Sequence, residues 1–278
     1  MTRRPWKLLS LGVLAALVGG PGLAAAQPVK VGAVVPLTGR YGAGGAQVRA
    51  GYEIAVEHIN AAGGVTVGGK KMPIEITILD DESDATKTVS RMETLAAQGV
   101  VAYLGGFGSD LHAAAASVAE KNKTPYLGVA FALHKVHEQG FKYLFSPFWK
   151  SPDIKTYTVD LLNSIPAAER PKAAAIFQEK TDWGREMATA WTEAAKQAGY
   201  QVAMVGEYAP GAKDFSDLIL KAKGAGADLV LGLPTPPDGT GIVNAVFVQW
   251  LNGKQELVFP KEAATAPLGY PAPPFAKR

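Results

Sequence analysis

The chain has 278 residues, of which 47% are hydrophobic and 19% are charged, and its formal net charge is +3. This length and apolar content suit one large or two modest α/β domains with a hydrophobic core. The near balance of 28 basic and 25 acidic residues argues against nucleic acid as a partner, because such proteins carry a basic patch or stripe. The chain contains no cysteine, so we expect neither disulfides nor a lipid anchor on cysteine.

The first 26 residues are typical of a cleavable signal peptide. Arg3, Arg4 and Lys7 precede a short apolar run, and 24–26 is a small-residue cleavage site of three alanines. The apolar run is too short to cross about 30 Å of hydrocarbon, and residues 19–21 (Gly-Gly-Pro) interrupt it. The sequence therefore predicts a soluble periplasmic protein, exported by either the Sec or the twin-arginine route.

From residue 29 to residue 147, strand patterns alternate with helix patterns. Alternating or continuous apolar runs predict strands, and apolar residues at helical spacing predict helices. The expected strands are 29–37, 74–80, 100–104, 124–129 and 143–145, and the expected helices are 48–59, 85–96 and 110–121. Such an alternation predicts a mostly parallel sheet with helices on its faces, which we assign to a first lobe over 27–147.

A second array of the same kind comes next, and it is shorter. The expected helices are 151–165, 182–198 and 214–223, and the expected strands are 173–177, 202–208 and 229–233. We assign 148–245 to a partial second lobe and 246–278 to a closing hairpin with an irregular tail, since Asn252-Gly253 is a hairpin turn signal. The predicted fold class is α/β, with two open, mostly parallel sheet lobes of which the second is incomplete.

Seven short segments along the chain are candidate family motifs: VGAVVPLTG at 31–39, GYEIAVEHINAAGGV at 51–65, DDESD at 80–84, GGFGS at 105–109, Gly140-Phe141, Asp182-Trp183-Gly184 and KDFS at 213–216. In this order they resemble the Leu/Ile/Val-binding family of periplasmic solute-binding proteins. The resemblance implies a type I periplasmic binding protein of an ABC importer, with a membrane permease as partner, no cofactor and no catalytic activity. The family has further strand–helix units after about residue 244, on the order of one hundred residues, so the second lobe is expected to be truncated.

In a two-lobed α/β protein the ligand is expected at the loops beyond the carboxyl ends of the strands. The loop 105–109 follows a strand and opens a helix, so its N–H groups and the Ser109 hydroxyl could receive a carboxylate; alternatively, Ser109 or Asp110 caps the helix. The resemblance implies that Ser109 holds the ligand carboxylate. It also implies that further contacts come from Tyr41, Ala130, Phe131, Ala132, Trp183 and Thr235. The expected ligand is an amino acid, an amide or an aromatic acid.

Enzymatic motifs are incomplete in this sequence. Gln47 replaces the last glycine of a dinucleotide-binding G-x-G-x-x-G, and Phe107 replaces the first glycine of a G-x-S-x-G nucleophile turn. The acidic run 80–84 could bind a hard cation, but it fits a turn that caps the next helix better. Two alternatives to import remain open: a ligand-sensing domain of the same fold that serves a receptor or regulator, and a truncated copy without function.

Overall fold

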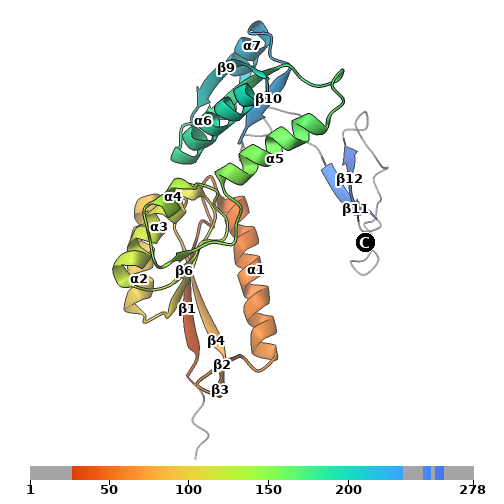
Figure 1. Cartoon of the computed structure of the whole chain (residues 1–278). Helices are drawn as coiled ribbons and strands as arrows, with labels where there is room; N and C mark the ends of the chain where they lie inside the picture. Colours follow the sequence, from red (N-terminus) through yellow and green to blue (C-terminus); the bar gives the residue numbers. More distant parts are fainter. Residues whose placement is uncertain (1–26, 234–246, 252–253, 260–278) are drawn as a thin grey trace, which may run out of the picture.

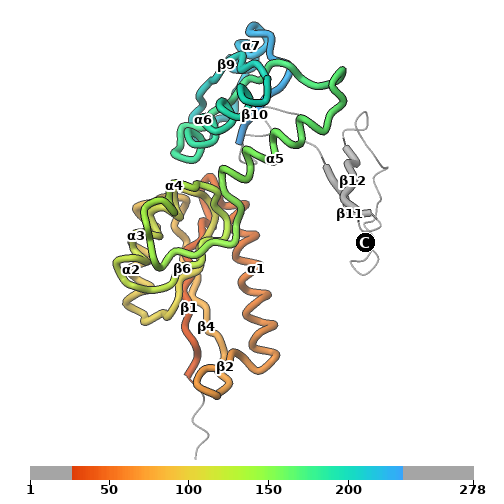
Figure 2. Tube along the Cα trace, viewed as in Figure 1, coloured from red at the N-terminus to blue at the C-terminus, as the bar shows by residue number. Residues whose placement is uncertain are grey.

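The computed structural model describes residues 27–233, 247–251 and 254–259. These residues form two α/β lobes that follow one another along the chain (Figure 1). The chain passes from the first lobe to the second at the start of helix α5 (Ser151–Ser164), as the trace in Figure 2 shows. No helix in these ranges is long and apolar enough to cross a membrane. The predicted signal peptide, Thr235 and most of the expected tail lie outside the described residues.

The first lobe is built on a parallel sheet with strand order β4-β1-β5-β6-β7. Its strands are β1 (Val29–Val35), β4 (Ile74–Asp80), β5 (Ala102–Leu104), β6 (Tyr126–Leu127) and β7 (Leu144–Phe145). Within this sheet the first strand, β1, therefore lies between the second, β4, and the third, β5. In such sheets the direction of winding reverses between the first and third strands, β1 and β5, and a ligand crevice forms beyond the carboxyl ends of those two strands.

Helices cover both faces of this sheet. Helix α1 (Gly42–Ala61) lies on one side, and α2 (Ala85–Ala97) and α3 (Ser109–Asn122) lie on the other (Figure 1). A single cluster of buried side chains joins helices α2 and α3 to the sheet, and Leu95 and Ala119 are fully buried in it. Burial of this continuous apolar layer supplies most of the favourable free energy that holds the lobe together.

The second lobe repeats the opening of the first. Its strands are β8 (Ala173–Glu179), β9 (Gln201–Tyr208) and β10 (Leu229–Gly232), and they form a parallel sheet in the order β10-β8-β9. Again the first strand lies between the second and the third. Alternate residues of β8 point to opposite faces, so Ile176 packs with α6 (Asp182–Gln197) and Phe177 packs with α7 (Ser216–Gly224).

An antiparallel hairpin of β11 (Phe247–Leu251) and β12 (Lys254–Phe259) comes after the second lobe, as the Asn252-Gly253 signal predicts. Two small elements were not predicted. A hairpin of β2 (Val65–Val67) and β3 (Lys70–Met72) turns at a Gly-Gly pair, a signal that the sequence does contain. The short helix α4 (Lys135–Glu138) has only one turn and too few residues for a periodicity.

The predicted element order is confirmed, but some boundaries differ. The strand expected at 124–129 is only the two-residue β6, and the ladder begins after Pro125, which has no N–H to donate. The strand expected at 100–104 begins at Ala102. The predicted fold class, with two open parallel sheets, agrees with the structure.

Candidate functional site

A cavity of about 420 Å³ lies between the lobes, beyond the carboxyl ends of β1, β5, β8 and β10. This is the place where both sheets reverse their winding. From the first lobe it is lined by Tyr41, Phe107, Gly108, Ser109, Ala130, Phe131 and Ala132; from the linking segment by Phe148 and Trp149; and from the second lobe by Glu179, Trp183, Gly232 and Leu233. The structure thus brings together every predicted site residue that it describes.

Ser109 is the first residue of α3 and is buried, with 6% of its surface exposed. The residue at the N-cap is Gly108, which has a positive φ of 104° and makes no side-chain cap. The alternative in which Ser109 or Asp110 caps the helix is therefore wrong. Instead the Ser109 Oγ accepts hydrogen bonds from the N–H groups of Ala132 (3.3 Å) and Leu133 (3.4 Å). Its own hydroxyl proton is left to donate to an acceptor such as a carboxylate.

Asp110 would repel an anion at this helix terminus if its charge were unpaired. The structure pairs it with Arg40 in an ion pair, and the Tyr41 hydroxyl donates to its other oxygen at 3.0 Å. Burial, together with the nearby Asp110 carboxylate, raises the pKa of Tyr41 well above its ordinary value. Tyr41 is therefore a neutral hydroxyl in the cleft wall, and Asp110 is an internal partner of the first turn.

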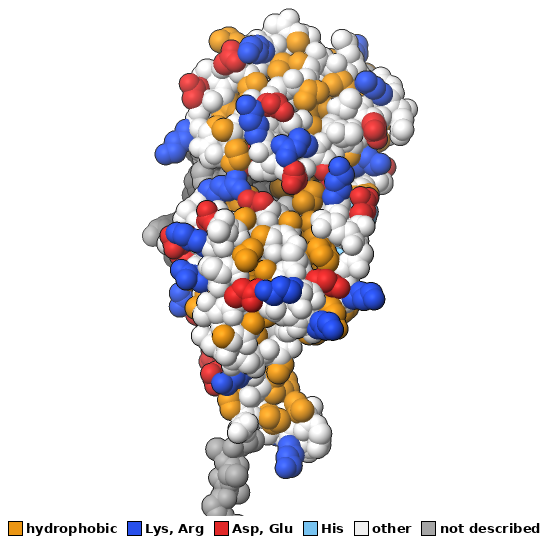
Figure 3. Space-filling model, turned by 90° about the vertical axis from the view of Figure 1, so that its left-hand side faces the viewer, with side chains coloured by type: hydrophobic (Ala, Val, Ile, Leu, Met, Phe, Trp, Pro, Cys, Tyr) orange, Lys and Arg blue, Asp and Glu red, His pale blue; other side chains and the backbone are white. Residues whose placement is uncertain are grey.

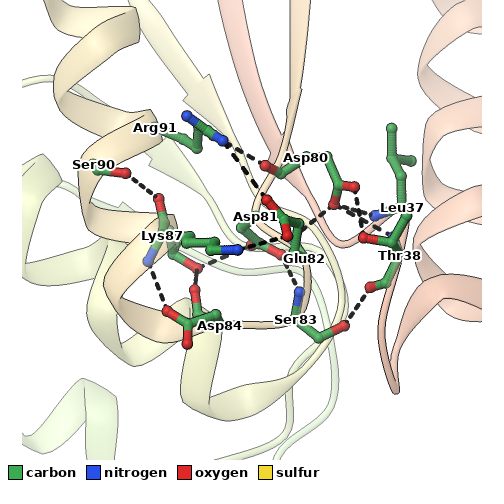
Figure 4. A network of polar contacts seen from close by, with 11 residues as sticks. Leu37, Thr38, Asp80, Asp81, Glu82, Ser83, Asp84, Lys87, Ser90 and Arg91 are labelled. Atoms are coloured by element: carbon green, nitrogen blue, oxygen red, sulfur yellow. Dashed lines mark hydrogen bonds and ion pairs between the residues drawn. The ribbon is translucent and has the colours of Figure 1, made fainter.

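The acidic run after β4 positions the loop that carries Tyr41. Asp80 accepts hydrogen bonds from the backbone N–H groups of Leu37 and Thr38 and from the Thr38 hydroxyl (Figure 4). The Ser83 hydroxyl donates to Thr38 O at 2.6 Å and accepts from the Tyr41 N–H at 3.1 Å. The hydrogen bonds to Asp80 hold the pKa of its carboxyl below the usual value. The run is a structural connection between two loops.

The interpretation of the acidic run as the cap of the next helix is confirmed by Asp84, which accepts from the Lys87 N–H at the start of α2. No group of three or more His, Asp or Glu side chains that could hold a metal ion occurs within the described ranges.

The loop 130–132 has its carbonyl groups bonded to other parts of the protein. Ala130 O accepts from the Gly108 N–H, Phe131 O accepts from the Lys150 ammonium, and Ala132 O accepts from both the N–H and the hydroxyl of Ser151. The loop is thereby attached to the start of α3 and to the start of α5. Its contribution to the cleft is a fixed apolar wall, because these carbonyl groups already have donors.

The ring of Phe131 stacks against the imidazole of His112 and against that of His137, at centroid distances of 4.6 and 5.6 Å. The Lys150 ammonium lies 3.7 Å from the centre of the same ring. Burial lowers the pKa of His112 to about 4, and partial burial lowers that of Lys150 to about 8. Phe131 is thus held in place by these three side chains at the wall of the cavity.

The second-lobe wall is formed by the loop between β8 and α6. Thr181 caps α6 by accepting from the Gly184 N–H, which places Trp183 in the first helical turn and against the cleft. Trp183 also packs against the buried cluster of the first lobe. Glu179, at the end of β8, is 3% exposed and accepts a hydrogen bond from the Thr181 hydroxyl.

Sequence reasoning missed five residues that line the cleft: Phe148, Trp149, Glu179, Gly232 and Leu233. Glu179 ends the observed strand β8, two residues beyond the strand predicted at 173–177, so its position just after that predicted strand was an available signal. Phe148 and Trp149 lie in the connection between the lobes, with ring centroids 4.3 Å apart, and no periodicity marks them. Thr235 cannot be placed, because it lies outside the described residues.

Two parallel sheets with the same strand order, facing one cavity across a short connection, are the architecture of type I periplasmic binding proteins. Residues 28–264 match the sequence profile of the family described as periplasmic binding protein, and the chain belongs to that family. It is a family of binding proteins rather than enzymes.

Individual relatives agree with this assignment. The chain is 31% identical over 227 residues to a Leu/Ile/Val-binding protein homolog of Brucella suis, with 80% of this chain and 55% of the relative covered. It is similar to the branched-chain amino acid transporter substrate binding protein LivJ of Streptococcus pneumoniae, solved with isoleucine, at a TM-score of 0.63 and 25% identity, covering 74% of this chain and 57% of that one. A solute binding protein of an R. palustris ABC transporter, solved with benzoate, shares the fold at a TM-score of 0.67 and 18% identity. The match covers 77% of this chain and 57% of that one.

The chain thus spans about 55% of the length of the curated relatives it matches. This agrees with the shortened second lobe that the sequence predicts and with the three strands described in the second sheet.

Proposed function

We propose that the protein captures a small carboxylate-bearing solute, an amino acid with an apolar side chain, in the cleft between the lobes and delivers it to an ABC importer from the periplasm. The observation that carries the proposal is the cavity of about 420 Å³ at the winding reversal of both sheets. Its volume lies within the range of about 300–1,000 Å³ that small-molecule sites occupy.

The chemistry of the walls supports such a ligand. The start of α3 offers backbone N–H groups, the positive end of the helix dipole and the Ser109 hydroxyl, all of which favour a carboxylate. The buried carboxylate of Glu179 lies in the opposite wall, where it favours an ammonium or another donor. Between the two, the aromatic rings of Phe107 and Trp183 offer apolar area to a side chain.

Calorimetric titration of the protein from Gln27 onward with L-leucine, L-isoleucine and benzoate tests the ligand class. We expect saturable binding of the two amino acids and weaker binding of benzoate, which carries no ammonium group. Ser109→Ala should weaken binding of all three, while Glu179→Gln should weaken only the amino acids. Tighter binding of benzoate than of either amino acid would contradict the proposal.

Delivery to an importer is tested separately by uptake of radiolabelled L-leucine in cells that lack the gene. We expect uptake to fall and to be restored by the wild-type gene but not by one with Ser109→Ala. Unchanged uptake, together with a transcriptional response to leucine that requires the gene, would instead support the ligand-sensing alternative.

A further inference from the structure

The two lobes are also in contact outside the cleft. Glu186 lies on α6 of the second lobe, and its two carboxylate oxygens accept hydrogen bonds from backbone N–H groups of the first lobe: Oε1 from His134 at 2.8 Å and Oε2 from Lys135 at 3.0 Å. His134 and Lys135 precede Glu186 by 52 and 51 residues in the sequence. We call this pair of hydrogen bonds the Glu186 clasp.

The clasp joins the two walls of the cleft. On α6, Glu186 is one turn after Trp183, which lines the cavity. In the first lobe, His134 and Lys135 lie just after the loop 130–132, which lines the cavity from the other side. The clasp therefore holds Trp183 and this loop at a fixed separation while the lobes are together.

Neither lobe would form these hydrogen bonds alone. The carboxylate is on one lobe and both N–H groups are on the other, so separation of the lobes transfers all three groups to water. Hydrogen bonds to an ionised carboxylate are about twice as strong as those between neutral groups. The groove around the clasp is partly apolar, with Leu133, Val136 and Ala190 among its lining residues. The hydrogen bond from His134 is partly buried, which reduces its screening by solvent, while the one from Lys135 is exposed.

We propose that Glu186 is a positioning residue for ligand capture: without touching the ligand, it stabilises the closed arrangement in which both walls meet the ligand. A contact present only in the closed form raises the closed population, and the apparent affinity for a ligand rises with that population. The proposal rests on the proposed solute-binding function, because closure has this consequence only for a protein that captures a ligand.

The test measures closure without any ligand. Since the chain contains no cysteine, Lys70→Cys and Lys223→Cys place two fluorophores specifically, one at the far end of each lobe, on exposed residues of β3 and α7. In this labelled protein, Glu186→Gln should shift the ligand-free distance distribution to longer distances, since an amide can accept from only one of the two N–H groups. The dissociation constant for L-leucine should rise about tenfold, which is the loss of one charge-assisted hydrogen bond.

Glu193→Gln is the matched control. Glu193 lies two turns further along the same helix and lines the same groove, and no hydrogen bond from its side chain to the first lobe occurs in the described residues. This variant should leave both the distances and the affinity unchanged. If it shifts them as much as Glu186→Gln does, the effect is one of net charge and the clasp proposal is overturned.

An unchanged ligand-free distribution in Glu186→Gln also overturns the proposal, whether or not leucine binds. Failure of the wild-type protein to bind L-leucine would overturn the proposed ligand, while the ligand-free distances would still decide about the clasp. Should circular dichroism show that Glu186→Gln is unfolded, Glu186→Asp keeps the charge with a shorter reach, and it should show the same shift with a smaller amplitude.

Discussion

The first lobe and the second lobe open with the same three strands and differ in the elements built onto them. In the first lobe, β6 and β7 extend the sheet beyond β5, and one cluster of buried side chains joins α2 and α3 to the sheet. In the second lobe, the described sheet has three strands, and its buried side chains fall into three separate clusters. Both lobes nevertheless present cleft loops after their first and third strands, and the first lobe adds the loop 130–132 after β6.

This difference separates two roles of the sheet. The position of the cleft follows from the first three strands of each sheet, because they create the reversal of winding. The stability of each lobe depends on how much apolar surface all its elements bury. A lobe with fewer strands can thus keep its binding wall while having less stability, and this distinction can be tested in four ways.

The largest expected effects come from truncating one core side chain in each lobe. Trp191, in the second lobe, is 5% exposed and its indole N–H donates to the Thr158 hydroxyl, while Leu95, in the first lobe, is fully buried. Trp191→Ala should cost about 3–5 kcal/mol of unfolding free energy and Leu95→Ala about 2–5 kcal/mol. Hydrogen exchange by residue should show faster opening only in the mutated lobe. Equal loss of protection in both lobes would mean that they unfold as one unit.

A smaller effect is expected from one glycine at the same place in each lobe. An added Cβ on Gly45, in the first turn of α1, would lie 1.8 Å from Pro36 O, and one on Gly184, in the first turn of α6, would lie 2.0 Å from Glu179 O. Gly45→Ala and Gly184→Ala should each cost roughly 2–4 kcal/mol, because the helix must move away from the strand end. Both changes should also weaken ligand binding. Gly51→Ala is the control, since nothing lies near its added Cβ.

Acidification should act on the first lobe through His112. Its pKa is lowered to about 4 in the fold, against about 6.5 in the unfolded chain, so the unfolded chain takes up the proton first and stability falls between about pH 6.5 and 4. His112→Gln removes this titration. The unfolding free energy of the wild type relative to the variant should therefore fall by up to about 3 kcal/mol over that range in urea titrations. The pKa of Asp81, raised by burial to about 6, has the opposite effect in both proteins and cancels in the difference.

Surface ion pairs should have the smallest effect and should not distinguish the lobes. Arg49 pairs with Glu53 on α1, and Lys221 pairs with Asp217 on α7, both at helical i,i+4 spacing and both exposed. Arg49→Ala and Lys221→Ala should each change the unfolding free energy by less than about 0.5 kcal/mol. A larger loss for Lys221→Ala alone would show that the second lobe depends on its surface charges.

Figure 3 shows charges of both signs interspersed over one face, without a large patch of one sign.

The sequence predicts the order of the elements well, because periodicity is a local property. It does not predict which side chains meet across long separations. The pairing of Asp110 with Arg40 spans 70 residues, and the two bonds of Ser109 to the loop after β6 span 23 and 24 residues. Glu186 is likewise not singled out from the sequence. Its partners are backbone groups at the start of a one-turn helix in the other lobe, and no pattern in the sequence marks them.

The hydrogen-bonded loop 130–135 has a consequence for the entropy of binding. Without counting the Glu186 clasp, five backbone groups at its start have partners in the first lobe or at the start of α5: the carbonyls of Ala130, Phe131 and Ala132, and the N–H groups of Ala132 and Leu133. A segment that is already ordered loses little conformational freedom when a ligand contacts it, and preorganisation of this kind raises affinity without any new contact. If the protein captures a solute as proposed, the entropic cost of capture falls mainly on the approach of the second lobe.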